Sequence, residues 1–252
     1  MTIEYFAEFI GTALLVLLGN GSVANATLKQ TKGQNAGMFF IAAGWGLAVF
    51  IGVVISQKYS GAHLNPAVTL GLAFSGLFPW EKVAPFILVQ ILGGAFGSLL
   101  VWTQYRDHFN RTEDQSSILG CFSTVPAIRN IPVNLFSEFI GTFVLMLTIF
   151  NIKDPEFLFD EASAKIGMGS LGALPVALLV TSIGISLGGT TGYAINPARD
   201  LGPRIMHALL PIKLKGDSDW SYSWVPIAGP ILGAIAAYAV MKIWDPISII
   251  SL

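Results

Sequence analysis

The feature that most constrains this chain is an internal duplication. The triplet Asn65-Pro66-Ala67 occurs again as Asn196-Pro197-Ala198, 131 residues later, and each copy has a glycine four residues before its asparagine. The segment Glu8-Phe9-Ile10-Gly11-Thr12 returns as Glu138-Phe139-Ile140-Gly141-Thr142 at an offset of 130 residues. Two motifs that repeat at nearly the same spacing predict one structural unit present twice. Duplicated apolar chains of this kind commonly transport solutes where the two halves meet.

Composition indicates that lipid surrounds most of the chain. Of the 252 residues, 53% are hydrophobic and only 12% are charged, whereas charged residues make up about 25% of a soluble domain. Crossing the hydrocarbon core as a helix takes about twenty apolar residues. Six runs meet this length, at roughly 5–28, 37–58, 83–105, 133–152, 171–190 and 222–244. We therefore predict an all-α membrane protein with a single transmembrane channel domain.

Each repeat is predicted to contain three spans and one shorter helix. The first repeat covers about 1–105, the second about 133–252, and a loop of about 106–132 joins them. Apolar segments at 66–77 and 197–209 are too short to span, and each begins at the proline of an Asn-Pro-Ala triplet. An asparagine cap followed by proline favours a helix start. Three spans per repeat invert the second unit, so we expect these two half-membrane helices to enter from opposite faces and meet at their N-termini.

The irregular segments that precede the half-helices are predicted to line a pore. Non-helical backbone at membrane depth is tolerated where it faces a water-filled cavity or is buried in protein. Its carbonyl groups are expected to form two ladders of hydrogen-bond acceptors. The ladders comprise Gly61, Ala62 and His63, and Gly192 and Ala194. Helix N-termini and the amides of Asn65 and Asn196 add positive potential and donors at the centre. This pattern predicts a channel for neutral solutes that excludes ions and protons.

The paired Gly-x-x-x-Asn-Pro-Ala elements and the Glu-Phe-Ile-Gly-Thr repeats resemble the major intrinsic protein family, the aquaporins and glycerol facilitators. The resemblance covers about residues 7–242. The stretch from Asn196 to Arg204 is similar to the glycerol-facilitator, or aquaglyceroporin, branch, because Asp200 follows the arginine where water-selective members usually carry a small residue. The resemblance implies a right-handed bundle with an inverted repeat, assembled as a homotetramer in the cell membrane with a pore in each protomer. It also implies cytoplasmic termini, an orientation that the distribution of lysine and arginine does not itself indicate.

The resemblance further implies a selectivity filter at the outer mouth. Its positions, identified by their distances from the Asn-Pro-Ala triplets, are Trp45, Gly184, Tyr193 and Arg199. Glycerol facilitators have Trp, Gly, an aromatic residue, usually Phe, and Arg there, whereas water channels typically place His where Gly184 stands. Arg199 offers a fork of donors to solute hydroxyls, and the two aromatic rings offer an apolar surface to the carbon atoms. The hydroxyl of Tyr193 makes the constriction more polar and slightly narrower than a phenylalanine would, so urea, water and protonated lactic acid remain candidate solutes beside glycerol.

Two glutamates and one Asp–Arg pair within the predicted membrane segments need an explanation besides Arg199. Glu8 and Glu138 could serve proton coupling, but their duplication favours a bracing role in which each accepts backbone N–H bonds from the irregular segment of its repeat. The family resemblance implies the same role. Asp200 and Arg204 are spaced to pair on one half-helix, and the family pattern implies an indirect effect on pore width.

Three functional classes follow from these features. A passive channel for glycerol and similar small neutral solutes, with some water permeability, is the preferred interpretation. A water-selective aquaporin is the near alternative, and an ion-coupled secondary transporter, which would need an ionisable relay, is the distant one. The sequence contains no nucleophile–base pair, phosphate loop or metal-ligand spacing, so we expect no enzyme activity, metal or cofactor. With a net charge of -1 and no basic block, the chain is expected to contact the lipid bilayer and not nucleic acid.

Overall fold

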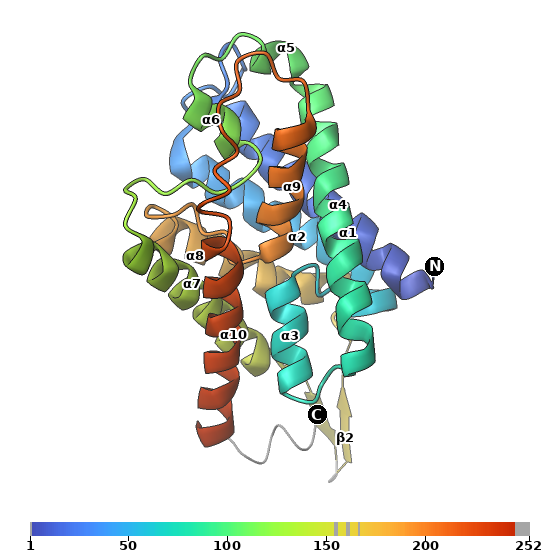
Figure 1. Ribbon diagram of the computed structural model, residues 1–252. Helices are drawn as coiled ribbons and strands as arrows, with labels where there is room; N and C mark the ends of the chain where they lie inside the picture. The colour runs from blue at the N-terminus through green and yellow to red at the C-terminus, as the bar shows by residue number, and fades with distance from the viewer. Residues whose placement is uncertain (1, 154–155, 160–161, 166, 245–252) are drawn as a thin grey trace.

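Six long apolar helical segments build the computed structural model (Figure 1), which describes residues 2–153, 156–159, 162–165 and 167–244. They are α1 (Ile3–Thr27), α2 (Gly37–Ser60), α4 (Trp80–Gln104), α7 (Ile131–Asn151), α8 (Leu174–Leu187) with the preceding 3-10 turn η1 (Gly169–Ala173), and α10 (Val225–Trp244). Each is long and apolar enough to cross a membrane, as the sequence predicts. The end of the predicted second repeat, 245–252, lies outside the described residues.

Two shorter helices follow the Asn-Pro-Ala triplets. Helix α3 (Pro66–Phe74) begins at the first proline and α9 (Pro197–Leu209) at the second. The side-chain oxygen of Asn65 accepts a hydrogen bond from the backbone N–H of Ala67, and that of Asn196 does the same for Ala198. Asparagine caps and N1 prolines therefore start both half-helices, because they satisfy or remove N–H groups that a helix start leaves without partners.

The half-helices pack against the long helices of the opposite repeat. Helix α9 lies along α4, and α3 lies along α10. Gly94 permits the first contact, since a Cβ atom there would stand 2.6 Å from the backbone oxygen of Ala198. Gly71 permits the second, since its Cβ would stand 2.6 Å from the Met146 side chain and 3.4 Å from that of Ala234. This exchange interlocks the two repeats.

The long helices within each repeat also touch through glycine. A Cβ atom at Gly93 or Gly97 of α4 would overlap the backbone oxygens of Phe9 or Ala13 in α1. In the second repeat, a Cβ at Gly233 of α10 would likewise overlap the backbone oxygen of Phe139 in α7. Small residues at matched positions thus let the backbones approach closely in lipid.

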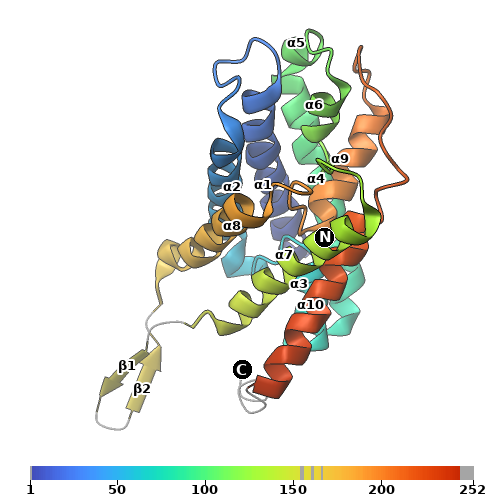
Figure 2. The ribbon, with the colours of Figure 1, turned by 90° about the vertical axis from the view of Figure 1, so that its left-hand side faces the viewer.

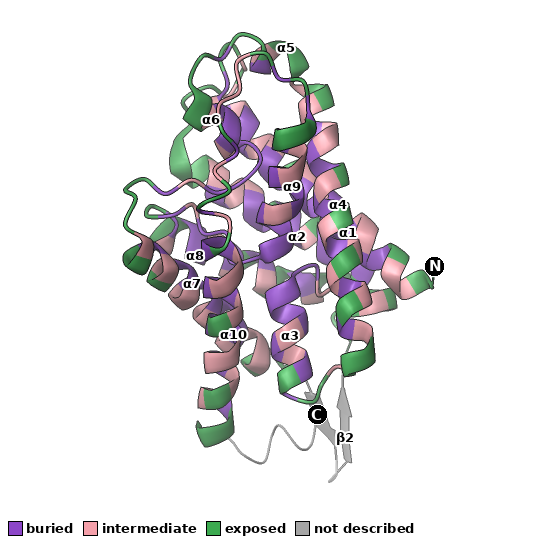
Figure 3. Ribbon diagram, viewed as in Figure 1, coloured by how far each residue is buried: buried purple, intermediate pink, exposed green. Residues whose placement is uncertain are grey.

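Buried residues gather on the inward helix faces (Figure 3), and many large apolar side chains are exposed on the outer surface. On α2, Phe39 and Leu47 are 71% and 66% exposed, and on η1 and α8 Leu171 and Leu178 are both 60% exposed. Large apolar side chains on an outer surface are what a lipid environment favours, so the burial pattern agrees with a protein that spans the bilayer.

The two ends of the bundle differ. We call the end that carries residues 28–36, 105–130 and 210–224 the loop face. The predicted connecting loop contains two short helices there, α5 (Arg106–Phe109) and α6 (Gln115–Gly120), and Phe109 and Phe122 pack with Leu28 in a separate buried cluster. At the opposite end, β1 (Glu156–Phe159) and β2 (Ala162–Lys165) pair antiparallel. Figure 2 shows this hairpin pointing away from the bundle, an addition that the sequence pattern did not predict.

Candidate channel pore and constriction

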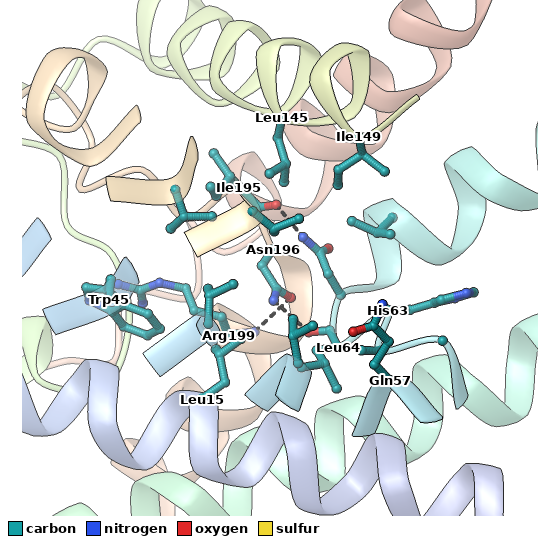
Figure 4. Close-up of a pocket in the computed structure, with 18 of the residues that line it drawn as sticks. Leu15, Trp45, Gln57, His63, Leu64, Leu145, Ile149, Ile195, Asn196 and Arg199 are labelled. Carbon is teal, nitrogen blue, oxygen red and sulfur yellow. Dashed lines mark hydrogen bonds between the residues drawn. The ribbon is translucent and has the colours of Figure 1, made fainter. Parts of the chain in front are cut away.

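Two cavities lie along the interface between the repeats. The larger, of about 320 Å³, is lined by both triplet asparagines and extends to Gln57 and Ile152 (Figure 4). The smaller, of about 250 Å³, lies under the loop face and is lined by Ser116, Gly120 and Thr124 among others. The residues that line both cavities are Trp45, Tyr193 and Arg199. These three side chains therefore stand at the junction of the two cavities, which we call the constriction.

Aromatic and cationic groups face each other at the constriction. The guanidinium carbon of Arg199 lies 4.4 Å from the centre of the Trp45 ring, close enough for a cation–π interaction. Gly184 of α8 lies behind the Tyr193 ring, since a Cβ atom there would stand 2.8 Å from the ring carbon Cζ and 2.9 Å from the Cβ of Ala42. The absence of a side chain at Gly184 thus leaves the space that the tyrosine ring occupies.

A second glycine accommodates Trp45. A Cβ atom at Gly19 of α1 would overlap the six-membered ring of the Trp45 indole. Trp45 is only 4% exposed, and its ring plane rests against this part of α1. The sequence pattern did not identify Gly19, because a single glycine in an apolar span does not reveal which distant ring it touches.

Three polar atoms at the constriction have no protein partner within the described part of the chain. They are the indole nitrogen Nε1 of Trp45, the hydroxyl of Tyr193 and Nη1 of Arg199. Leaving a buried donor without a partner costs about 1–3 kcal/mol. A solute or water in the constriction can satisfy these donors, so the arrangement is suited to molecules that carry hydroxyl groups.

The two triplet asparagines connect the repeats at the centre. Nδ2 of Asn65 donates to the backbone oxygen of Ile195 at 2.8 Å, and Nδ2 of Asn196 donates to that of Leu64, also at 2.8 Å. The relation is reciprocal, as Figure 4 shows. Because each amide nitrogen carries two hydrogens, one remains on each side chain for a molecule in the larger cavity.

The backbone before each half-helix adopts the same unusual conformation. Ala62 and Leu64 have φ angles of 55° and 50°, and the matching Tyr193 and Ile195 have 40° and 43°. Left-handed backbone is unfavourable for residues other than glycine, and such strain concentrates at functional sites. The alternation turns successive carbonyl groups in directions that a helix or strand does not allow.

The carbonyl groups of these segments are available to the cavities. Among the described residues, none of the backbone oxygens of 61–63 and 192–194 accepts a protein hydrogen bond. Gly61, Ala62, His63 and Ala194 line the larger cavity, and Gly192 lines the smaller one. The imidazole of His63 packs against the rings of Phe78 and Phe86, with centroid distances of 4.5 and 5.2 Å.

Glu8 holds the first irregular segment. Its carboxylate accepts hydrogen bonds from the backbone N–H groups of His63 at 2.9 Å and Leu64 at 2.7 Å. It also accepts from the Ser60 hydroxyl at 2.6 Å and from the Gln90 amide at 2.7 Å. Gln90 of α4 is a participant that the sequence pattern did not reveal, since its role depends on how α1, α3 and α4 pack together.

Glu138 makes the corresponding contacts in the second repeat. Its carboxylate accepts the backbone N–H groups of Ala194 at 3.0 Å and Ile195 at 2.8 Å. The side chain is fully buried, so these bonds replace the water that an ionised carboxylate would otherwise require. Both glutamates thereby stabilise left-handed backbone that its own residues do not favour.

The remaining predicted pair lies inside α9. Nε of Arg204 donates to Oδ1 of Asp200 at 2.8 Å, and both side chains are buried.

Beyond the C-terminal end of α9, the ammonium group of Lys215 donates to the backbone oxygens of His207, Ala208 and Leu210 at 2.7–2.8 Å. Burial lowers the pKa of Lys215. A cation at the negative end of a helix dipole is favourable, and the sequence pattern did not identify it.

The single cysteine is buried on the loop face. Cys121 has no exposed surface, and its thiol donates to the backbone oxygen of Ser117 at 3.1 Å. Burial raises the pKa of Cys121 to about 12. Since the thiolate is the reactive species, the neutral thiol predominates at every pH below that value.

We therefore expect iodoacetamide to modify Cys121 more than about a hundredfold more slowly than a free cysteine at pH 8, because ionisation of the buried thiol is suppressed. Intact-mass spectrometry of the protein in mild detergent measures the rate. Unfolding in sodium dodecyl sulfate provides the control, as it should restore rapid modification. Equal rates in the folded and unfolded protein would contradict a buried, neutral thiol.

Six spanning helices, two half-helices that meet at paired asparagines and cavities lined by free carbonyl groups define a membrane channel. In the described ranges, no group of His, Cys, Asp and Glu side chains is arranged to hold a metal ion. The sequence model of the major intrinsic protein family matches residues 1–241, and the chain belongs to this family. It is a multi-pass membrane channel protein and not an enzyme.

Individual relatives agree with this assignment. The chain is 50% identical over 241 residues to the glycerol uptake facilitator protein of Streptococcus pneumoniae R6, covering 96% of this chain and 99% of the relative. It is 53% identical to a probable glycerol uptake facilitator protein of Thermotoga maritima, covering 92% and 94%. The X-ray structure of the aquaglyceroporin from Plasmodium falciparum matches with a TM-score of 0.79 and 31% identity, covering 97% of each chain.

Proposed function

We propose that this protein is a passive channel for glycerol and other small neutral solutes, with some water permeability, that excludes ions and protons. The observation that carries the proposal is the constriction, where Arg199 lies over the Trp45 ring, Tyr193 lines the same space, and Gly184 supplies the room for the tyrosine. A linear polyol has hydroxyl groups along one side and C–H groups along the other. The names of the relatives, glycerol uptake facilitators and an aquaglyceroporin, support this solute class.

Passage through the constriction exchanges water for protein contacts. Solute hydroxyls accept hydrogen bonds from Nη1 of Arg199 and the hydroxyl of Tyr193, which are otherwise without partners among the described residues. The carbon atoms of the solute contact the Trp45 ring. Beyond the constriction, the carbonyl ladders of 61–63 and 192–194 accept hydrogen bonds from the solute. A solute that both donates and accepts therefore loses little of its hydration free energy on entry.

Ions and protons meet opposing electrostatics in the same path. The N-termini of α3 and α9 meet at Asn65 and Asn196, so the positive ends of both helix dipoles lie at the centre. Arg199 adds a full positive charge at the constriction. These charges repel cations, and the buried, narrow constriction offers anions no replacement for their water shell. Neutral molecules avoid both penalties.

The supporting residues complete the proposed site. Asn65, Pro66 and Ala67 with Asn196, Pro197 and Ala198 form the meeting point of the half-helices. Glu8 and Glu138 brace the two ladders through backbone N–H bonds. Asp200 and Arg204 affect pore width without touching the solute.

The wider organisation of the protein is also part of the proposal. The repeats comprise about 1–105 and 133–252, and the chain assembles as a homotetramer in which exposed apolar faces such as those of α2 and α8 contact neighbouring protomers or lipid. Both termini lie on the cytoplasmic side of the cell membrane, which places the loop face outside. Each protomer conducts through its own pore.

Light scattering from liposomes that contain the purified protein tests this function. An inward glycerol gradient should cause shrinkage followed by rapid re-swelling without any proton gradient, and a protonophore should leave the rate unchanged. Shrinkage without re-swelling would indicate a water-selective channel, and dependence on a proton gradient would indicate a coupled transporter. Replacement of Arg199 by alanine serves as a site variant and should change the relative rates for glycerol and water.

Tyr193→Phe should raise the glycerol-to-water permeability ratio. The hydroxyl is buried against Gly184, so its removal gives the ring room to move back toward α8 and helps the wider solute more than water. We expect a rise of about threefold, which corresponds to about 0.65 kcal/mol in relative barrier height. Stopped-flow light scattering measures both permeabilities on the same liposomes. A ratio that stays the same would show that the Tyr193 hydroxyl does not set selectivity.

A further inference from the structure

One residue outside the membrane helices is held tightly by the charged pair of α9. Oδ2 of Asp200 accepts hydrogen bonds from the backbone N–H of Thr124 at 2.8 Å and from its hydroxyl at 2.7 Å. Nη2 of Arg204 donates to the backbone oxygen of Thr124 at 3.1 Å. Every polar group of this threonine is thus bound to one buried ion pair.

The same arginine reaches a second segment of the loop face. Nη1 of Arg204 donates to the backbone oxygens of Ser218 at 2.8 Å and Asp219 at 3.1 Å. Nε and Nη2 are directed to Asp200 at 2.8 and 3.1 Å. The Arg204 side chain is completely buried, and each of its three nitrogen atoms donates a hydrogen bond. It therefore fixes the segment before α7 and the segment between α9 and α10 relative to each other.

Thr124 is in turn a neighbour of the constriction. It lines the smaller cavity together with Gly192, Tyr193 and Arg199. Its methyl carbon lies 3.4 Å from the place where a Cβ atom would stand on Gly192. Three residues further on, the backbone N–H of Ala127 donates to the oxygen of Thr190 at 2.9 Å. The segment 124–127 therefore lies beside the segment 190–193, which ends at Tyr193.

The first repeat supports its ladder differently. Thr69, which follows Asn65 by the same four positions as Asp200 follows Asn196, has its hydroxyl 3.0 Å from the amide nitrogen of Gln90. Gln90 belongs to a membrane helix and also donates to Glu8. Support for the first ladder thus comes from within the helix bundle.

The second repeat has no amide side chain at the position that matches Gln90. Gly93 of α4 and Gly233 of α10 occupy matching places, because a Cβ atom at each would overlap the matching backbone oxygens of Phe9 and Phe139. Three residues before Gly233 stands Pro230, where the first repeat has Gln90. A proline side chain has no donor, and Asp200, which stands where the first repeat has Thr69, is bonded instead to Thr124 and Arg204.

We propose that Asp200, Arg204 and Thr124 form a clamp that positions Tyr193 and thereby makes solute selectivity depend on the loop face. The clamp residues are positioning residues, since they act through the segment 190–193. This inference rests on the proposed channel function but concerns a different question, namely what holds the constriction at its width. Release of Thr124 should widen the range of positions open to Tyr193 and favour larger solutes.

The test compares Thr124→Val, which keeps the size of the side chain and removes its hydroxyl donor, with Thr124→Ser, which retains the hydroxyl. In liposomes, Thr124→Val should reduce the preference for glycerol over the four-carbon polyol erythritol by about fivefold, and Thr124→Ser should restore most of it. A smaller amount of folded protein lowers both fluxes by the same factor, so it cannot by itself change their ratio. An unchanged ratio in Thr124→Val would overturn the clamp as a selectivity element.

A second measurement does not depend on the solute. Hydrogen exchange of peptides that cover residues 188–199, followed by mass spectrometry, should become about tenfold faster in Thr124→Val. The matched control is Thr112→Val, because Thr112 is also buried and hydrogen-bonded on the loop face but lines neither cavity. Unchanged exchange in Thr124→Val, or equal acceleration in both variants, would overturn the clamp. Absence of glycerol flux in the unmodified protein would instead count against the proposed function.

Discussion

Gly184→Ala is expected to lower glycerol permeability at least about tenfold. The added methyl group would stand 2.8 Å from Cζ of Tyr193 and 2.9 Å from Cβ of Ala42. Carbon atoms that are not bonded prefer separations of about 3.5–4.0 Å. Ala42 belongs to α2, which packs against α8 and cannot easily give way. The tyrosine ring must therefore move toward the constriction. Initial re-swelling rates of liposomes, normalised to the amount of reconstituted protein, measure the effect.

The control for this substitution is Gly21→Ala. Gly21 also lies in a membrane helix, but a Cβ atom there has no neighbour within 4 Å. It should leave glycerol permeability unchanged, because helical alanine is favourable. Water is smaller than glycerol, so its permeability in Gly184→Ala should fall less. If Gly184→Ala conducts glycerol at the unmodified rate, the tyrosine ring does not limit the pore.

Glu138→Gln should destabilise the protein and disrupt the second ladder. The carboxylate is fully buried and accepts the N–H groups of Ala194 and Ile195. A glutamine keeps only one acceptor oxygen, and its NH2 group would face a backbone donor. Loss of a hydrogen bond to a charged group costs about 1.5–3 kcal/mol, which corresponds to a decrease in Tm of about 5–10 °C. Thermal unfolding in detergent measures the change.

Flux distinguishes this bracing role from general stabilisation. At a temperature well below its Tm, Glu138→Gln should still conduct glycerol at least about tenfold more slowly, because the left-handed backbone before α9 loses its support. Glu81→Gln is the matched control, since Glu81 is an exposed carboxylate at the start of α4. Equal Tm values and equal fluxes for Glu138→Gln and the unmodified protein would show that the carboxylate is not required.

Local sequence patterns were sufficient for the six spans and the two half-helices of this fold. Apolar runs predicted the six spans, because the thickness of the bilayer sets a length that can be counted along the chain. Asn65-Pro66 and Asn196-Pro197 marked the starts of α3 and α9, since caps involve residues two or three positions apart. The short helices α5 and α6 carry weaker signals, and the sequence predicts only a loop there.

The duplicated motifs, their spacing and the family resemblance also brought the constriction residues into one prediction. What the sequence by itself determined was therefore the membrane class, the duplicated motifs and the half-helices, while the pore residues stay a prediction from the family resemblance. Only the tertiary structure decided that α9 packs on α4, that Gly19 accommodates Trp45, and that Thr124 joins Asp200 and Arg204. Those contacts join residues far apart in the chain, and their partners depend on how helices pack in three dimensions, which no local pattern encodes.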